Sequence, residues 1–242
     1  MSTTGFRDKV EATDFPRMDA EYRDLLMRVL RIQADCEIGG PHLYVRNILP
    51  TAPSKADQLI VARTAAEEAD HYRKVARLAG DIGVDVSDIL SRPNRDRYVN
   101  AFRGDIRTWE DFAVFGFLID RVGRYQLEEF IGGTYAPLDR ILPDIIVEEQ
   151  GHIEYGHTTT AELAARGGDS KERVQTSIDF WYARALDMFG SASSRRSARY
   201  LYWGIKRRSN AEARDEYMRE VRPLIEAMGL RVPDPTAGRE FM

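Results

Sequence analysis

Apolar side chains recur every three to four residues along most of this chain, the spacing that places them on one face of an α-helix. The first such segment begins near residue 19 and carries the acidic residue Glu37 close to its end. Gly39-Gly40-Pro41 follows and should bend or break the helix. The apolar positions that define this segment are Tyr22, Leu25, Leu26, Val29, Leu30, Ile32 and Cys36.

The same periodicity predicts five further helical segments. The second begins at Ser54, a good helix N-cap, and ends near the glycines at 80 and 83. A long connection over residues 81–108, with a short helix at 88–90, leads to the third segment. The third to sixth segments are expected at residues 108–132, 137–166, 170–189 and 200–228.

This pattern predicts an all-α protein, because no stretch alternates as a strand would. A long crossover between two helical hairpins is typical of a ferritin-like four-helix bundle. We therefore expect one ferritin-like domain over residues 1–242. Within it, residues 1–17 are a flexible N-terminus, 18–166 a di-metal four-helix bundle and 170–242 a helical extension.

A repeated motif stands in the second and fourth helical segments. Both contain Glu-Glu-x-x-His, with Glu68 and His71 in one copy and Glu149 and His152 in the other. Residues three apart lie on the same face of a helix, so each Glu and His can reach one point. A carboxylate with an imidazole suits a first-row transition metal, although these residue types leave iron and manganese open.

Two more acids complete a four-helix metal site. Glu37 lies 31 positions before Glu68, and Asp120 lies 29 positions before Glu149. Turn-forming sequences at 50–54 and 132–137 lie halfway between the members of each pair, so each acid should face its motif across a hairpin. Two Glu-x-x-His helices and two further acids are the ligand set of di-iron and di-manganese bundles.

Some neighbouring acids remain alternatives to these choices. Glu67 and Glu148 precede the two histidines by four positions and could also face the site. Glu128 and Glu129 compete with Asp120, although Asp120 interrupts an apolar run in which an unpaired acid would be costly. A further Glu-x-x-His, at residues 154–157, is out of phase with the better motif and is interpreted as incidental.

Composition narrows the classes of function. The chain has 242 residues, of which 43% are hydrophobic and 31% charged, and its net charge of −4 argues against general nucleic-acid binding. No apolar run approaches the length of a membrane span, and the first residues lack a signal-peptide hydrophobic region. The single cysteine, Cys36, fits a reducing compartment. These features predict a cytoplasmic protein with no nucleic-acid or membrane partner.

A cationic cluster lies in the C-terminal extension, at Arg195, Arg196, Arg199, Lys206, Arg207 and Arg208. It is either a helix face that pairs with acidic neighbours or a site for a phosphate-bearing substrate or acidic partner.

The sequence resembles the catalytic subunit of the phenylacetyl-CoA epoxidase (phenylacetate ring-epoxidation) family of ferritin-like di-iron oxygenases. The resemblance covers roughly Glu37 to Pro235. It lies in Leu118-Ile119-Asp120, in Thr134-Tyr135-Ala136-Pro137 and in the second metal motif. The most specific part of the resemblance lies near the C-terminus, in residues 204–210 and 229–235.

The resemblance implies a di-iron monooxygenase that activates O2 and inserts one oxygen atom into the aromatic ring of an aryl-acyl-CoA such as phenylacetyl-CoA. It also implies an oligomer, a structural paralogue subunit, and electrons from a separate NAD(P)H-dependent reductase with flavin and iron–sulfur centres. The two iron ions would be held by Glu37, Glu68, His71, Asp120, Glu149 and His152.

Three other functions fit parts of the same pattern. They are a metal-storage protein, a non-catalytic scaffold subunit, and a di-iron hydroxylase whose substrate is not an acyl-CoA. The extension of about seventy residues fits subunit contacts better than storage. The complete ligand set argues against the scaffold.

Overall fold

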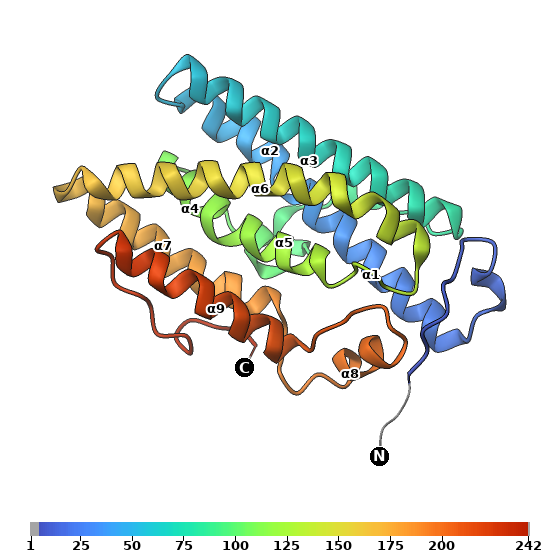
Figure 1. Ribbon diagram of the computed structural model, residues 1–242. Helices are drawn as coiled ribbons and strands as arrows, with labels where there is room; N and C mark the ends of the chain where they lie inside the picture. Colours follow the sequence, from blue (N-terminus) through green and yellow to red (C-terminus); the bar gives the residue numbers. More distant parts are fainter. Residues whose placement is uncertain (1–4, 242) are drawn as a thin grey trace.

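The structure, a computed structural model, describes residues 5–241. Two helical hairpins pack together as a four-helix bundle, with the C-terminal helices along one side (Figure 1). The first hairpin is α1 (Ala20–Gly39) and α3 (Lys55–Asp81), and the second ends in α6 (Ala136–Ala165). This confirms the all-α, ferritin-like fold. Over the described residues the only β-type pairing is an isolated bridge between Val10 and Tyr135.

Each helix of the first hairpin begins at a residue whose side chain caps the helix N-terminus. The Asp19 carboxylate accepts from the Glu21 backbone N–H, and the Ser54 hydroxyl accepts from that of Asp57. Helical structure does not stop at Pro41. It continues through α2 (Pro41–Leu43), the π-helical turn η2 (Tyr44–Ile48) and η3 (Leu49–Thr51). Because Pro41 stands at the start of α2, its missing N–H leaves no helical hydrogen bond unmade.

The third bundle helix differs from the regular helix expected over residues 108–132. It consists of α4 (Trp109–Phe115), a π-helical turn η7 (Gly116–Asp120) and α5 (Arg121–Glu128). Thr108 and Asp111 form a capping box at its start. A π-helical turn accommodates an extra residue in a helix, and here that turn ends at Asp120.

The second hairpin is held together by a close approach of two backbones. A Cβ atom on Gly156 of α6 would lie 2.5 Å from the Phe117 nitrogen and 2.6 Å from the Gly116 carbonyl carbon. Only glycine fits at this distance. The contact fixes η7 against α6 one turn away from both Asp120 and His152.

The crossover between the hairpins runs through three 3-10 turns, η4 (Ser87–Ser91), η5 (Asn94–Asp96) and η6 (Asn100–Arg103). The first includes the short helix expected at residues 88–90. A fully buried ion pair anchors the crossover, because Arg97 contacts Asp35 of α1 at 2.9 Å.

The C-terminal part contains α7 (Gly168–Met188), α8 (Arg195–Tyr202) and α9 (Asn210–Ala227). A single helix over residues 200–228 was the expectation, and it is wrong, because the chain breaks at 203–209. Gly204 has a φ of +61°, and a Cβ atom there would lie 2.8 Å from the Thr134 side chain and 2.9 Å from the Phe6 carbonyl oxygen. The loop is therefore shaped by its contact with the N-terminal segment.

The N-terminal segment also differs from expectation. Residues 1–4 lie outside the described residues, but residues 5–17 pack on the bundle instead of being loosely ordered. Val10 and Phe15 are buried. The Val10 backbone N–H donates to the Thr134 carbonyl at 2.7 Å, and its own carbonyl accepts from the Ala136 N–H at 3.1 Å. Among residues 5–241, none of the helices has the length and apolar character needed to span a bilayer.

Candidate metal centre

The bundle interior brings the six residues expected from the sequence into two overlapping groups. Glu37, Glu68, His71 and Glu149 form one group; Glu68, Asp120 and His152 form the other. Within each group the possible ligand atoms lie within 4.8 Å of one another. Glu68 belongs to both groups. The six residues come from α1, α3, η7 and α6, so each helix of the bundle contributes at least one of them.

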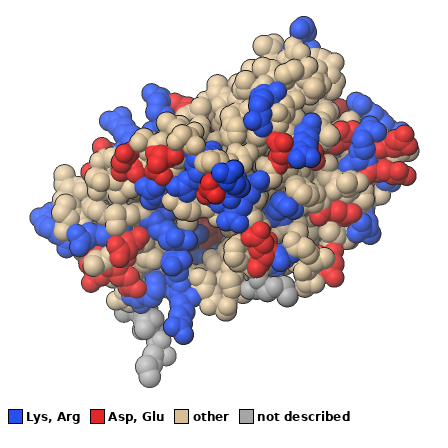
Figure 2. All heavy atoms as spheres, turned by 180° about the vertical axis from the view of Figure 1, so that it is seen from behind, with Lys and Arg blue, Asp and Glu red and all other residues tan. Residues whose placement is uncertain are grey.

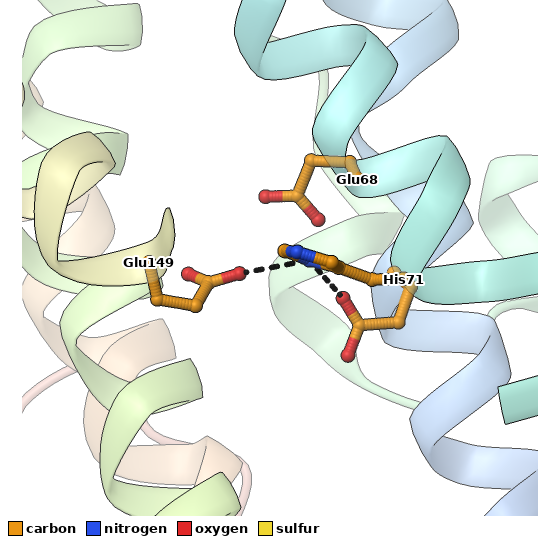
Figure 3. Close-up of side chains that lie close together, drawn as sticks. Glu68, His71 and Glu149 are labelled. Atoms are coloured by element: carbon orange, nitrogen blue, oxygen red, sulfur yellow. Dashed lines mark ion pairs between the residues drawn. The ribbon is translucent and has the colours of Figure 1, made fainter. Parts of the chain in front are cut away.

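Each histidine presents its Nδ1 atom to the carboxylates of the cluster. His71 Nδ1 lies 3.4 Å from Glu37 Oε2 and 3.4 Å from Glu149 Oε1, and Figure 3 shows Glu68 and Glu149 directed toward the same ring. His152 Nδ1 lies 3.4 Å from Glu68 Oε1 and 3.9 Å from Glu149 Oε2. The two rings are 6.5 Å apart between centroids. The two imidazole rings thus lie on opposite sides of the Glu68 and Glu149 carboxylates.

The outer nitrogen of each histidine is held by a carboxylate from the opposite helix. His71 Nε2 on α3 lies 2.7 Å from Glu148 of α6, and His152 Nε2 on α6 lies 2.8 Å from Glu67 of α3. This reciprocal arrangement places Glu67 and Glu148 behind the rings and outside the inner cluster. A carboxylate on the outer nitrogen fixes the tautomer and orientation of a metal-binding histidine.

Both Nδ1 atoms are buried without a hydrogen-bond partner. With Nε2 donating to a carboxylate, the lone pair of each neutral ring is on Nδ1 and points into the cluster. Four carboxylates and two such nitrogens fit a pair of first-row transition-metal ions. The chemistry and geometry of the donors therefore match a dimetal site.

The remaining alternatives from the sequence lie elsewhere. Glu129 is buried against Arg208, and Glu128 pairs with Arg124 and Arg208. His157 stacks on Phe117, with ring centroids 5.0 Å apart. None of these three residues belongs to the cluster.

Burial and mutual repulsion raise the proton affinity of the metal-free cluster. Burial, then the charge of Glu149, raises the pKa of Glu68 to about 8 and that of Asp120 well above its usual range. Burial disfavours the charged imidazoles, but the surrounding carboxylates outweigh it and raise the pKa of His71 to about 12 and that of His152 to about 10. A metal pair would replace these protons.

The metal-free protein should lose stability as pH rises. The pKa values of Glu68, His152 and His71 are all higher in the folded than in the unfolded chain, so the folded state binds more protons. Glu68 should cause a loss of stability between pH 4.5, the ordinary glutamate pKa, and about pH 8. The histidines should cause a further loss that begins at pH 6.5 and ends at about pH 10 for His152 and at about pH 12 for His71. Urea unfolding of chelator-treated protein between about pH 6 and about pH 9 would measure it. Metal-loaded protein is the control, and its free energy of unfolding should depend less on pH. An equal dependence on pH in the two forms would contradict the prediction.

Replacing an outer carboxylate should weaken metal binding without unfolding the chain. Glu148→Gln keeps a hydrogen-bond acceptor for His71 but removes the negative charge, as Glu67→Gln does for His152. We expect metal affinity to fall about 10- to 100-fold in either variant. Competition with a coloured chelator measures this. Glu154→Gln, on the exposed side of α6, is the matched control, and an equal loss there would show a non-specific effect.

A small cavity of about 30 Å³ adjoins the cluster, lined by Glu37, Glu68, Asp120 and Glu149. Ile119, next to Asp120, adds apolar surface to its wall, whereas Phe112, Phe115 and Phe117 pack in the core of the bundle. No sequence pattern marked the other wall residues, which include Gln33, Tyr44, Phe102, Gln126 and Met188.

A larger cavity of about 350 Å³ lies outside the small one, and Gln33, Gln126 and Met188 line both. Arg28, Arg196 and Lys206 supply positive charge to its wall. Figure 2 shows Lys and Arg side chains gathered over the middle of one face of the molecule, between patches of Asp and Glu. Four residues of the predicted cationic cluster fall into two pairs with different surroundings. Lys206 and Arg196 line the cavity, whereas Arg199 and Arg208 form ion pairs with Glu21 and Glu129.

The bundle and its carboxylate–histidine cluster define a ferritin-like protein of the dimetal-carboxylate class. The chain belongs to the phenylacetic acid catabolic protein family, whose model matches residues 3–240. It is 30% identical over 222 residues to one of the subunits of 1,2-phenylacetyl-CoA epoxidase of Escherichia coli (strain K12), covering 90% of this chain and 72% of that protein.

Two other proteins are similar to this chain. Benzoyl-CoA oxygenase component B of Aromatoleum evansii is 27% identical over 220 residues, which are 79% of this chain and 46% of that protein. A solved structure of an R2-like ligand-binding oxidase mutant with an aerobically reconstituted Mn/Fe cofactor superimposes with a TM-score of 0.52. It is 13% identical, and the match covers 91% of this chain and 78% of that one, so it supports the fold.

Proposed function

We propose that this chain is the di-iron monooxygenase subunit of an aryl-acyl-CoA oxygenase, with phenylacetyl-CoA as the first substrate to test. One observation carries the proposal: six carboxylate and imidazole groups from four helices meet in the bundle, with both Nδ1 atoms free to bind metal. The names of the two relatives supply the substrate class, since one belongs to an epoxidase and the other to an oxygenase for aryl-CoA thioesters.

In this proposal Glu37 and His71 would hold one iron, and Asp120 and His152 would hold the other. Glu68 belongs to both groups of donors and Glu149 faces both histidines, so these two carboxylates would be available to both ions. When bound and reduced, two irons would supply two electrons to O2, so that one oxygen atom could enter the ring and the other could leave as water with two protons. The chain's own task is to keep the site dry and fixed, which burial of the cluster and the outer carboxylates Glu67 and Glu148 support.

The larger cavity is the proposed access route for the thioester. Arg28 and Arg196 are exposed at its wall and Lys206 is half-buried, so they suit the phosphates of coenzyme A. Val29, Phe130 and Met188 provide apolar surface deeper in the molecule, where an acyl chain would lie. The acyl end then faces the wall shared with the small cavity.

Electrons must come from another protein. The sequence holds one cysteine, Cys36, and no Gly-rich dinucleotide motif, so it lacks the means to bind an iron–sulfur cluster or a flavin dinucleotide in the usual ways. We infer a separate NAD(P)H-dependent reductase with flavin and iron–sulfur centres. An oligomeric assembly with a structural paralogue subunit is part of the same proposal.

The direct test combines the iron-loaded chain with its structural paralogue subunit, its reductase, NAD(P)H and phenylacetyl-CoA under isotope-labelled dioxygen. The expected product is a ring epoxide that carries one labelled oxygen atom. Free phenylacetate is the control substrate and should not react. Turnover of phenylacetate alone would favour a hydroxylase with a non-CoA substrate, and absence of product with both would overturn the proposal.

A further inference from the structure

The wall between the two cavities contains a residue that touches the metal cluster. Gln33 lies on α1, one turn before Glu37, and is buried. Its side-chain amide donates to Glu37 Oε1. The same side chain lines both the larger and the smaller cavity. Gln33 therefore faces the proposed substrate path and a proposed metal ligand.

The small cavity must enlarge before an aromatic ring can reach the cluster. Its volume of about 30 Å³ holds a water molecule, whereas a cavity on the order of 150 Å³ is known to accept benzene. A ring arriving from the larger cavity meets Gln33, Gln126 and Met188. Gln126 donates to the Met188 carbonyl at 2.9 Å, so its hydrogen bond ends on the backbone. The hydrogen bond of Gln33 ends on the cluster itself.

The two oxygens of Glu37 have different partners. Oε2 lies 3.4 Å from His71 Nδ1 and so faces the cluster, whereas Oε1 accepts from Gln33. While this hydrogen bond is in place, it competes with the metal position for Oε1. Displacing the Gln33 amide would release Oε1 to turn toward the metal.

We propose that Gln33 is a positioning residue that couples substrate arrival to the coordination of the metal pair through Glu37. The acyl group would push the Gln33 amide aside, and Glu37 Oε1 would lose its donor. Glu37 would then be free to turn both oxygens toward the metal that it would hold with His71. This coupling rests on the proposed function. It makes the oxygen-activating state depend on a bound substrate.

The test uses the full chain loaded with iron, reduced without oxygen, and titrated with phenylacetyl-CoA. Equilibrium dialysis measures binding, and near-infrared circular dichroism of the reduced irons reports their coordination. Gln33→Met and Gln33→Asn both remove the contact with Glu37, the second by shortening the side chain. Gln126→Met is the matched control, because it changes the same wall without touching a proposed ligand.

Wild-type protein and Gln126→Met should bind phenylacetyl-CoA with a change in the spectrum. The two Gln33 variants should bind it with that change lost. A full spectral response in either iron-loaded Gln33 variant overturns the coupling, as does binding to wild type without any response. Loss of iron from both variants also overturns it, since Gln33 would then be needed for metal binding. Absence of binding to wild type is a different failure, because it refutes the proposed function itself.

Discussion

Glu68→Ala is expected to abolish binding of both irons and to reduce oxygenase activity to the background of the metal-free protein. Glu68 is the residue shared by the two ligand groups, so its loss removes a donor from each metal position at once. It also faces His152 Nδ1 at 3.4 Å, which connects α3 to α6 at the site. Iron analysis after reconstitution, together with oxygen-dependent turnover, measures the effect.

The fold of this variant should survive. In the metal-free protein, burial and the neighbouring Glu149 charge raise the pKa of Glu68 to about 8, so removing the carboxyl relieves an unfavourable arrangement. This relief opposes the cost of the cavity left by alanine. We expect the two to cancel to within about 1 kcal/mol, or about 2–4 °C in the unfolding midpoint. Circular dichroism of the metal-free forms tests this.

Asp70→Ala is the matched control for Glu68→Ala, because Asp70 lies on the same helix and pairs with Arg73 and Lys74 at the surface. It should retain both irons and full turnover. Normal iron content in Glu68→Ala would refute the proposal that Glu68 serves both metal positions. Loss of iron in Asp70→Ala would mean that any change in α3 disrupts the site.

Gly156→Ala should be the most destabilising small substitution in the bundle. The added methyl would lie 2.5 Å from Phe117 N and 2.8 Å from the Ala113 carbonyl oxygen, and these are backbone atoms that cannot rotate away. Overpacking of this kind costs about 3 kcal/mol or more, since two helices must separate, which corresponds to about 6–12 °C in the midpoint. The same separation would move Asp120 away from His152 and lower iron occupancy.

Gly151→Ala, five residues earlier on α6, is the control. A methyl there meets only Arg63 Nη2, at 3.7 Å, which is an ordinary contact. Alanine is favoured over glycine in a helix by about 0.5–1 kcal/mol, so this variant should be slightly more stable than wild type. Equal unfolding midpoints for the two variants would refute the close-approach argument.

Much of this architecture was predictable because the sequence repeats its spacing. Ser54 begins α3 as expected, and Glu37 and Asp120 lie opposite the two Glu-x-x-His motifs because the turns are centred between them. Periodicity predicts which face of a helix a residue lies on. Its distance in sequence from the hairpin turn predicts its position along the helix axis. Together these two features predicted which side chains meet.

Other features depend on contacts between segments that are distant in the sequence, and the local spacing of residues does not predict these contacts. Glu67 and Glu68 both precede His71 on a turn of α3, but the histidine that Glu67 holds is on α6. The π-helical turn that ends at Asp120 packs against α6, and the break at Gly204 packs against the N-terminal segment. Gln33 carries no motif, and only its place between two cavities distinguishes it.

The measurement that tests the central claim most directly is iron content of the purified, iron-reconstituted chain, combined with Mössbauer spectroscopy of its oxidised form. Two irons per chain, magnetically coupled and with oxygen and nitrogen ligands, are the predicted result, because Glu68 and Glu149 lie between two histidines. Many irons per chain would indicate storage. A chain that binds no iron even with its partner subunits present would contradict the assignment of a dimetal oxygenase.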